Sequence, residues 1–176
     1  SDSSIYKPTV ERCVNTADID VSADYSDGED GQNYIYASGI FSSNGNSSTA
    51  SGAGGKVIDC FNAGNITVKN ANNGARNNCY AYGIGFPWDR ESCYNVGMIS
   101  ADENKNYSVG SCTSAPKRKS YYLSGTGVNS SNSVTELTKA QMKLKSMYSG
   151  WDFDTVWTMD GRDDYPYPEL QSVELI

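Results

Sequence analysis

Apolar and polar positions recur in one fixed frame three times along the chain. The frame is clearest from Val57 to Val68, VIDCFNAGNITV, and returns in ERCVNTADIDV from Glu11 and in ESCYNVGMISA from Glu91. Each copy has a cysteine, a valine or aromatic residue, an asparagine, a short bend, an isoleucine and a final Val or Ala. Fixed-frame self-similarity predicts a repeat architecture in which successive copies stack.

Three columns of identical residues follow from this alignment. They are Cys13, Cys60 and Cys93; Asn15, Asn62 and Asn95; and Ile19, Ile66 and Ile99. Alternation along a strand places the cysteine, the asparagine and the isoleucine of each copy inside the stack. We interpret the asparagines as a hydrogen-bonded ladder in a bend. A degenerate fourth copy, SYYLSGTG, begins at Ser120.

The cysteine column favours buried reduced thiols over disulfides. Five cysteines is an odd number, so a complete disulfide framework would leave one thiol over. Side chains stacked in parallel also present the disulfide dihedral angle poorly. A metal site would require closely spaced cysteines or histidine partners, and the chain contains no CxxC motif and no histidine.

A shorter frame provides a second set of columns. It reads YASGI from Tyr36, YAYGI from Tyr80 and YSVGS from Tyr107. Alternation predicts that the small residues of this frame point inward and that Tyr36, Tyr80 and Tyr107 form an outward stripe. An exposed aromatic stripe is a candidate platform for a glycan or protein ligand, although tyrosine is also common on solvated β-surfaces.

A second outward column is also rich in aromatic residues. It consists of Val14, Phe61, Tyr94 and Tyr121. The C-terminal stretch is rich in tryptophan and needs a surface on which to bury it. We therefore expect that stretch to cover this column, which leaves the tyrosine stripe exposed.

The combined pattern in AYGIGFPWDRESCYNVGMISA resembles the GLUG-motif repeats of large bacterial cell-surface proteins. The C-terminal LTKAQMKL…GWDFDTVWTMDGRDDYPYPEL is similar to the tail that often closes such arrays. The chain departs from the pattern at Ser120, where a cysteine is usual, and at Ser111, which replaces an apolar residue. The resemblance implies a parallel β-solenoid and an extracellular, cell-surface location. It implies no activity.

The expected fold class is therefore all-β, a parallel β-solenoid. It would be a right-handed β-helix of about three to four irregular coils. Residues 1–128 would form the solenoid, with repeats at 10–22, 34–68, 79–101 and 107–127. Residues 129–176 would form one short helix, N-capped by Thr138, and a Trp-rich β-hairpin whose first strand runs from Trp151 to Met159. This segment would dock on a flank of the solenoid or cap its end.

Composition narrows the classes of partner. The formal net charge of −7 argues against nucleic acid, which requires clustered Lys and Arg. No run of 18 apolar residues occurs, so we expect no membrane insertion. The acidic stretch ADYSDGEDGQN suggests a weak calcium site at Asp24, Asp27 and Asp30, but it lacks EF-hand spacing, and a solvated loop is the other interpretation.

We expect no enzymatic activity and no cofactor. Without histidine, no His-based triad or His-metal site can form. A polysaccharide-active β-helix enzyme would need acids converging in one outward column of neighbouring turns. Here Glu11, Ile58 and Glu91 share a column, so the acids do not converge.

The favoured function is a non-enzymatic extracellular module of a larger bacterial surface protein. It would serve in adhesion or display, or as a spacer, as a monomeric unit of a longer chain. The first alternative is a carbohydrate-binding module that uses Tyr36, Tyr80 and Tyr107. The partner, a host or bacterial surface glycan or protein, cannot be named from fold resemblance.

Overall fold

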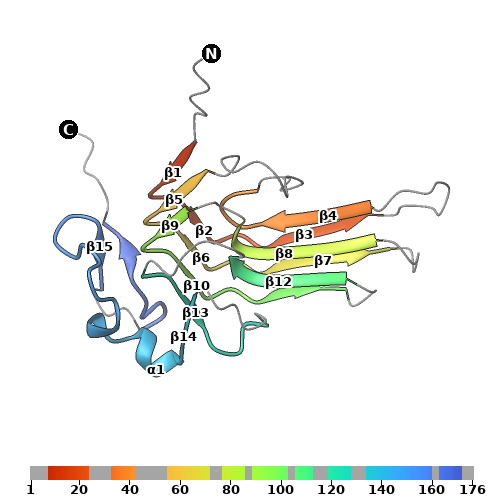
Figure 1. Ribbon diagram of the computed structural model, residues 1–176. Helices are drawn as coiled ribbons and strands as arrows, with labels where there is room; N and C mark the ends of the chain where they lie inside the picture. The colour runs from red at the N-terminus through yellow and green to blue at the C-terminus, as the bar shows by residue number, and fades with distance from the viewer. Residues whose placement is uncertain are drawn as a thin grey trace, which may run out of the picture.

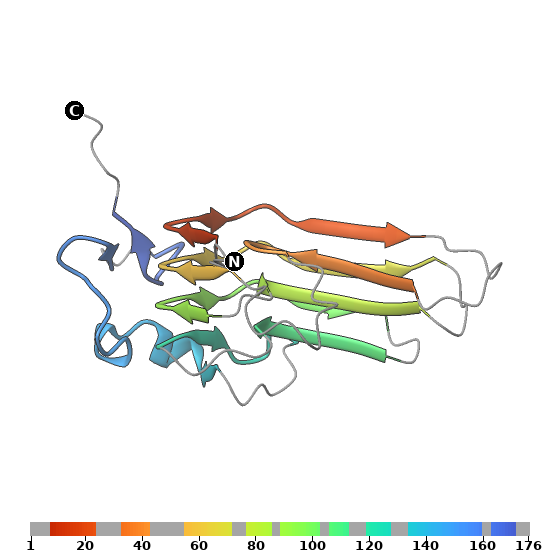
Figure 2. The same cartoon turned by 45° about the horizontal axis from the view of Figure 1, so that its top comes forward.

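The computed structural model describes residues 8–23, 33–42, 55–71, 77–85, 89–102, 106–112, 119–127, 134–159 and 163–171. Over these residues the protein is mostly β, and strands from successive copies of the frame lie one above another (Figures 1 and 2). The expectation of an all-β fold with parallel sheets is confirmed.

The strands of the described residues form four parallel sheets and one antiparallel pair. The first sheet contains β1 (Thr9–Glu11), β5 (Lys56–Ile58) and β9 (Asp89–Glu91). The second contains β2 (Val14–Asn15), β6 (Phe61–Asn62), β10 (Tyr94–Asn95), β13 (Tyr121–Leu123) and β14 (Thr135–Leu137). The third contains β3 (Ile19–Ala23), β7 (Ile66–Asn70) and β11 (Ile99–Ala101). The fourth contains β4 (Asn33–Ser38), β8 (Asn77–Gly85) and β12 (Asn106–Cys112).

Equivalent residues of the long frame are register partners. Ile66 lies between Ile19 and Ile99 in the third sheet. Asn62 lies between Asn15 and Asn95 in the second. Because strand periodicity is two, this register brings each side chain next to its own equivalent in the neighbouring copy. We call residues 8–23 the first turn, and the copies that begin at β5 and β9 the second and third turns.

A left-handed corner precedes the strand of the second sheet in every copy of the long frame. The corner residues have φ between 51° and 53° and are Arg12, Asp59, Ser92 and Lys119. They directly precede Cys13, Cys60, Cys93 and Ser120, so the degenerate copy at Ser120 shares the frame. None of them is glycine, although this conformation costs an L-residue about 1–2 kcal/mol. Packing of the strands on both sides must hold the corner in place.

The interior of the stack is closely packed, and much of it is apolar. Ile66, Val68, Ala81 and Ile99 belong to one buried cluster. The short frame lies against the asparagine column, because a Cβ added at Gly83 would come within 2.2 Å of the Asn95 Oδ1. This close approach requires glycine at that position, as expected where opposite walls of the stack meet.

The C-terminal segment contains the expected short helix. Helix α1 (Lys139–Met142) has Thr138 as its N-cap, and a reciprocal capping box joins Thr138 to Gln141. A 3₁₀ turn, η1, follows at Lys145–Met147. In the described residues no helix is long and apolar enough to cross a membrane.

The predicted Trp-rich hairpin is shorter than expected. Only Trp157–Thr158 (β15) is strand, and it pairs antiparallel with Glu169–Leu170 (β16). Residues 153–156 form turns instead. Trp151 and Trp157 lie with ring centroids 4.4 Å apart in one cluster, so the chain between them folds back rather than extending.

Candidate functional site

The predicted tyrosine stripe is present in two of its three copies. Tyr36 on β4 and Tyr80 on β8 are register partners, and their rings stack with centroids 4.9 Å apart at 14°. Tyr82 lies beside Tyr80 at 6.4 Å. Both Tyr36 and Tyr80 are half-buried. Because each ring covers the face of its neighbour, the stripe presents ring edges and hydroxyl groups, which suit hydrogen bonding better than face-on stacking of a sugar.

Tyr107 does not occupy the predicted column. In β12 Tyr107 pairs with Cys79, and Ser108 pairs with Tyr80. The register then shifts between Gly110 and Cys112, where one residue of β12, Ser111, opposes two residues of β8, Gly83 and Ile84. Matching the letters YSVGS to YAYGI assumed an unbroken register, so the prediction for Tyr107 was wrong by one residue.

The candidate calcium residues Asp24, Asp27 and Asp30 lie outside the described residues. Within the described ranges, no group of three or more Cys, Asp or Glu side chains is arranged to hold a metal ion.

The cysteine column forms a chain of contacts between turns. The Cys13 backbone N–H donates to the Cys60 Sγ at 3.3 Å, and the Cys93 N–H donates to the Ser120 Oγ at 3.3 Å. Ser120 therefore takes the acceptor role of the missing cysteine. Cys60 and Cys93 are buried and Cys13 is exposed, and all three are reduced thiols. Partial burial and the adjacent Cys60 raise the pKa of Cys13, and a hydrogen bond with Cys93 lowers the pKa of Cys60.

The asparagine column forms a directional ladder. The Asn15 Nδ2 donates to the Asn62 Oδ1 at 2.7 Å, and the Asn62 Nδ2 donates to the Asn95 Oδ1 at 2.7 Å. Each amide also donates to a backbone carbonyl two residues ahead, for example Asn62 to Gly64 at 2.7 Å. The ladder therefore satisfies the backbone groups that the bend leaves unpaired.

The second aromatic column is covered by the C-terminal segment. Phe61, Tyr94 and Tyr121 share a buried cluster with Trp151 and Trp157. The cover is fastened by polar contacts, because Trp151 Nε1 donates to the Lys119 carbonyl at 2.7 Å and the Tyr94 hydroxyl donates to the Pro168 carbonyl. Burial raises the pKa of the Tyr94 hydroxyl, which stays protonated as a donor.

Only the first-turn member of this column is uncovered. Val14 is 49% exposed, whereas Phe61 is 5% and Tyr94 is 0% exposed. The C-terminal segment thus covers the second, third and fourth copies of the column and leaves the first copy open.

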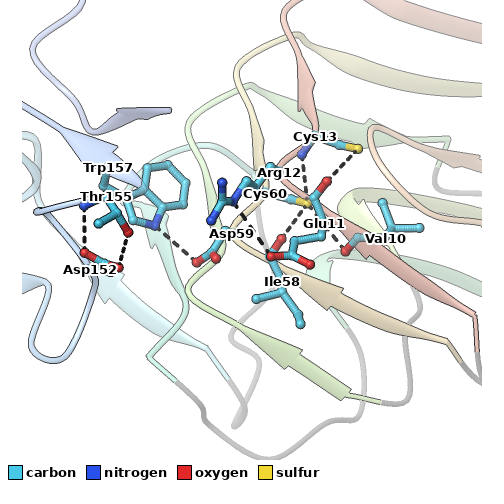
Figure 3. Close-up of polar contacts among 10 residues, drawn as sticks. All are labelled: Val10, Glu11, Arg12, Cys13, Ile58, Asp59, Cys60, Asp152, Thr155 and Trp157. Atoms are coloured by element: carbon cyan, nitrogen blue, oxygen red, sulfur yellow. Dashed lines mark hydrogen bonds and ion pairs between the residues drawn. The ribbon is translucent and has the colours of Figure 1, made fainter. Parts of the chain in front are cut away.

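Several carboxylates lie in a row at or next to the left-handed corners, beside the C-terminal segment. Figure 3 shows Glu11, Asp59 and Asp152. The Asp59 Oδ1 accepts from the Trp157 Nε1 at 3.2 Å. Burial raises the pKa of Asp59, the hydrogen bond from Trp157 opposes that shift, and the Glu11 charge adds to it. Glu11 lies 3.8 Å from Arg12 in an ion pair.

The register separates the acids of this row. Ile58 lies between Glu11 and Glu91 in the first sheet, as the sequence frame predicts. Glu91 also has Lys56 as an ion-pair partner at 3.6 Å. Glu11 is thus paired with Arg12 of its own corner, and Glu91 is paired with Lys56 of the neighbouring turn. Asp152, close by, accepts from the backbone N–H groups of Asp154 and Thr155 and caps a turn.

Sequence reasoning missed one buried charge. Arg90 is the register partner of Val57, which in turn pairs with Val10, and Arg90 is fully buried. Nothing in the local pattern indicated this position, because a charged residue in a repeat normally marks an outward column.

Comparison with family models, with curated proteins and with solved structures gave no match for this chain.

Proposed function

We propose that this chain is a β-solenoid module of a larger bacterial surface protein, in which it acts as a rigid spacer or display unit outside the cell. The module would be non-enzymatic, would need no cofactor and would be monomeric. It would hold neighbouring domains away from the surface, or present them there.

One observation carries this proposal. The same columns are in register from turn to turn, so the stack is held by repeated contacts between neighbouring turns along one axis. Stability in such an array is approximately the sum of the turns and the interfaces between them. An array of this kind provides length and stiffness without a dedicated active site.

The resemblance of the frame to GLUG-motif repeats favours a location outside the cell. The full burial of Cys60 and Cys93 would limit the oxidation of these two thiols there.

The second candidate function is carbohydrate binding. The partly exposed pair of Tyr36 and Tyr80 favours it, because hydroxyl groups and ring edges line one strip of β4 and β8. The third strand places Ser108 rather than a tyrosine in that column, which shortens the platform to two rings.

Glycan and surface-protein arrays separate these functions. A spacer shows no saturable binding to either array, and it turns over no polysaccharide. In single-molecule pulling, it resists force as one unit and unfolds in one cooperative event. Saturable glycan binding that Tyr80→Ala abolishes, with the tryptophan fluorescence unchanged, would overturn the spacer proposal in favour of carbohydrate binding.

A further inference from the structure

The first turn has an alanine where the second and third turns have glycine. Ala17 lies two residues after Asn15 and two before Ile19. Gly64 and Gly97 have the same spacing from their own column residues. The flanking asparagines and isoleucines are register partners, so the three positions are equivalent in the stack.

Glycine at this position is required by space. A Cβ added at Gly64 would lie 1.9 Å from the Ala17 carbonyl oxygen, and one added at Gly97 would lie 1.9 Å from the Gly64 carbonyl oxygen. Neither glycine has a positive φ, so conformation is not the reason for it. In both cases the obstructing atom belongs to the backbone of the preceding turn, which cannot rotate away as a side chain could.

The methyl group of Ala17 therefore points to the place where a preceding turn would put its carbonyl. A further turn of the same frame, stacked at the spacing of the inner turns, would bring that oxygen about 1.9 Å from the Ala17 Cβ. Such a contact is far inside van der Waals distance. The stack can continue only if the spacing opens, and opening it breaks the parallel hydrogen bonds.

The asparagine ladder closes at the same place. The Oδ1 atoms of Asn62 and Asn95 each accept from the asparagine of the preceding turn. The Asn15 Oδ1 instead accepts from the Ala17 backbone N–H at 3.3 Å, within its own turn. In the first turn, the asparagine Oδ1 is thus satisfied by a donor of the same turn. In the inner turns, the asparagine of the preceding turn satisfies it.

We propose that residues 8–23 are a terminating turn, in which the Ala17 methyl group prevents another turn of the same frame from stacking. This inference rests on the proposed function as a stacked module and specifies it further. The stack is then closed to same-frame elongation at the first turn, so neither a second copy nor an added repeat of this frame extends it there.

Insertion of an extra turn tests this proposal. A second copy of residues 56–88 is placed directly before Thr9, because Thr9 and Asp89 both pair with Lys56. The inserted copy carries Cys60→Ser, which follows the example of Ser120. The insertion is made in the natural chain and in an Ala17→Gly chain, with Ala17→Gly alone as the matched control. Alkylation of the exposed Cys13 is followed by peptide mass spectrometry, and tryptophan fluorescence verifies the folded body.

Stacking of the inserted turn would bury Cys13. We expect its alkylation to slow at least about tenfold in the Ala17→Gly chain with the insertion. In the natural background, the rate of Cys13 alkylation with the insertion should stay within about twofold of the rate without it. Equal protection in both backgrounds, or protection in neither, overturns the role of Ala17. Dimerisation of the natural chain with loss of Cys13 reactivity overturns it too. A negative result for Ala17 would not test the spacer function. Conversely, a ligand found on the arrays would contradict the spacer function without affecting the result for Ala17.

Discussion

The first turn and the two inner turns have the same frame but opposite environments. Every residue from 8 to 23 is exposed or half-buried. In the second turn, the equivalent column residues are almost fully buried: Val57, Cys60, Phe61, Asn62, Ile66 and Val68. Asparagine shows the contrast within one residue type, because Asn15 is half-buried and Asn62 has no exposed surface.

This difference shows that burial in the stack comes from the neighbours and not from the residue types. An inner turn has a turn on both sides and, in the aromatic column, the C-terminal segment as well. Within the part of the chain that the structure describes, the first turn has a neighbouring turn on one side only. Substitutions at equivalent positions of an inner turn and of the first turn should therefore have unequal effects on stability.

The largest contrast is expected at the glycine position. Gly97→Ala places a Cβ against the Gly64 carbonyl oxygen and should lower the free energy of unfolding by about 4 kcal/mol. Ala17→Gly removes only an exposed methyl group and should cost about 0.5–1 kcal/mol. Urea unfolding followed by tryptophan fluorescence measures both. Equal, small effects would show that the inner turns are not stacked as closely as described.

The aromatic column should give the next largest contrast. Phe61 stacks on Tyr94 with ring centroids 4.9 Å apart, so Phe61→Ala should lower the free energy of unfolding by about 3 kcal/mol. Val14→Ala, at an exposed position of the same column, should cost less than about 0.5 kcal/mol. Thermal and urea unfolding report both values. A large loss for Val14→Ala would mean that the cover extends over the first turn.

The asparagine ladder should show a smaller contrast. Asn62→Ala leaves the Gly64 carbonyl and the Asn95 Oδ1 without their buried donor and should cost about 2 kcal/mol. Asn15→Ala removes a partner at the open end, where water can replace it, and should cost about 1 kcal/mol or less. Urea midpoints of the two variants, measured side by side, decide the order. The reverse order would contradict the direction of the ladder.

The smallest effect is expected at the left-handed corners. The raised pKa of Asp59 means that the folded protein holds this proton more tightly than the unfolded chain does. The Asp59 contribution to stability is therefore largest in acid. This contribution declines as the pH rises from 3.8, the ordinary pKa of an aspartate, through the raised pKa of Asp59 in the folded protein.

Asp59→Asn keeps an acceptor for Trp157 and removes this decline. After allowance for solvent screening, the variant should be more stable than the natural chain by about 0.5 kcal/mol at neutral pH. The difference should shrink towards pH 3. Arg12→Asn, at the equivalent first-turn corner, removes a positive charge that lowers the pKa of Asp59. This variant should therefore be less stable than the natural chain at neutral pH, and the difference should shrink towards pH 3. Stability curves measured from pH 3 to 7 test it, and a difference that grows in acid would contradict the assigned sign.

The sequence predicted the long frame well, because its columns are set by a period that is present in the chain itself. Cys60, Asn62 and Ile66 are buried where alternation placed them. The cap at Thr138 was also predictable, since capping depends on local residues only. Both are properties of single positions or fixed spacings.

Some features that depend on contacts between distant segments could not be predicted, although the cover of the aromatic column by the C-terminal segment was. A register shift between Gly110 and Cys112 displaced Tyr107 from its expected column, and no residue in YSVGS marks it. The Trp151–Met159 stretch folds back on itself because its rings gather over Tyr94, which lies far away in the sequence. Left-handed corners at Arg12 and Asp59 carry no glycine to announce them.

The parallel, in-register stack can be tested most directly through three isoleucines. Ile19, Ile66 and Ile99 are successive register partners, so neighbouring members should be roughly 4.8 Å apart along the stack and the outer two about twice that distance. Methyl-labelled isoleucine NMR should show cross-relaxation between Ile19 and Ile66 and between Ile66 and Ile99, with no direct transfer from Ile19 to Ile99. Contact between Ile19 and Ile99 without contact to Ile66, or isolation of any of the three, would contradict the account.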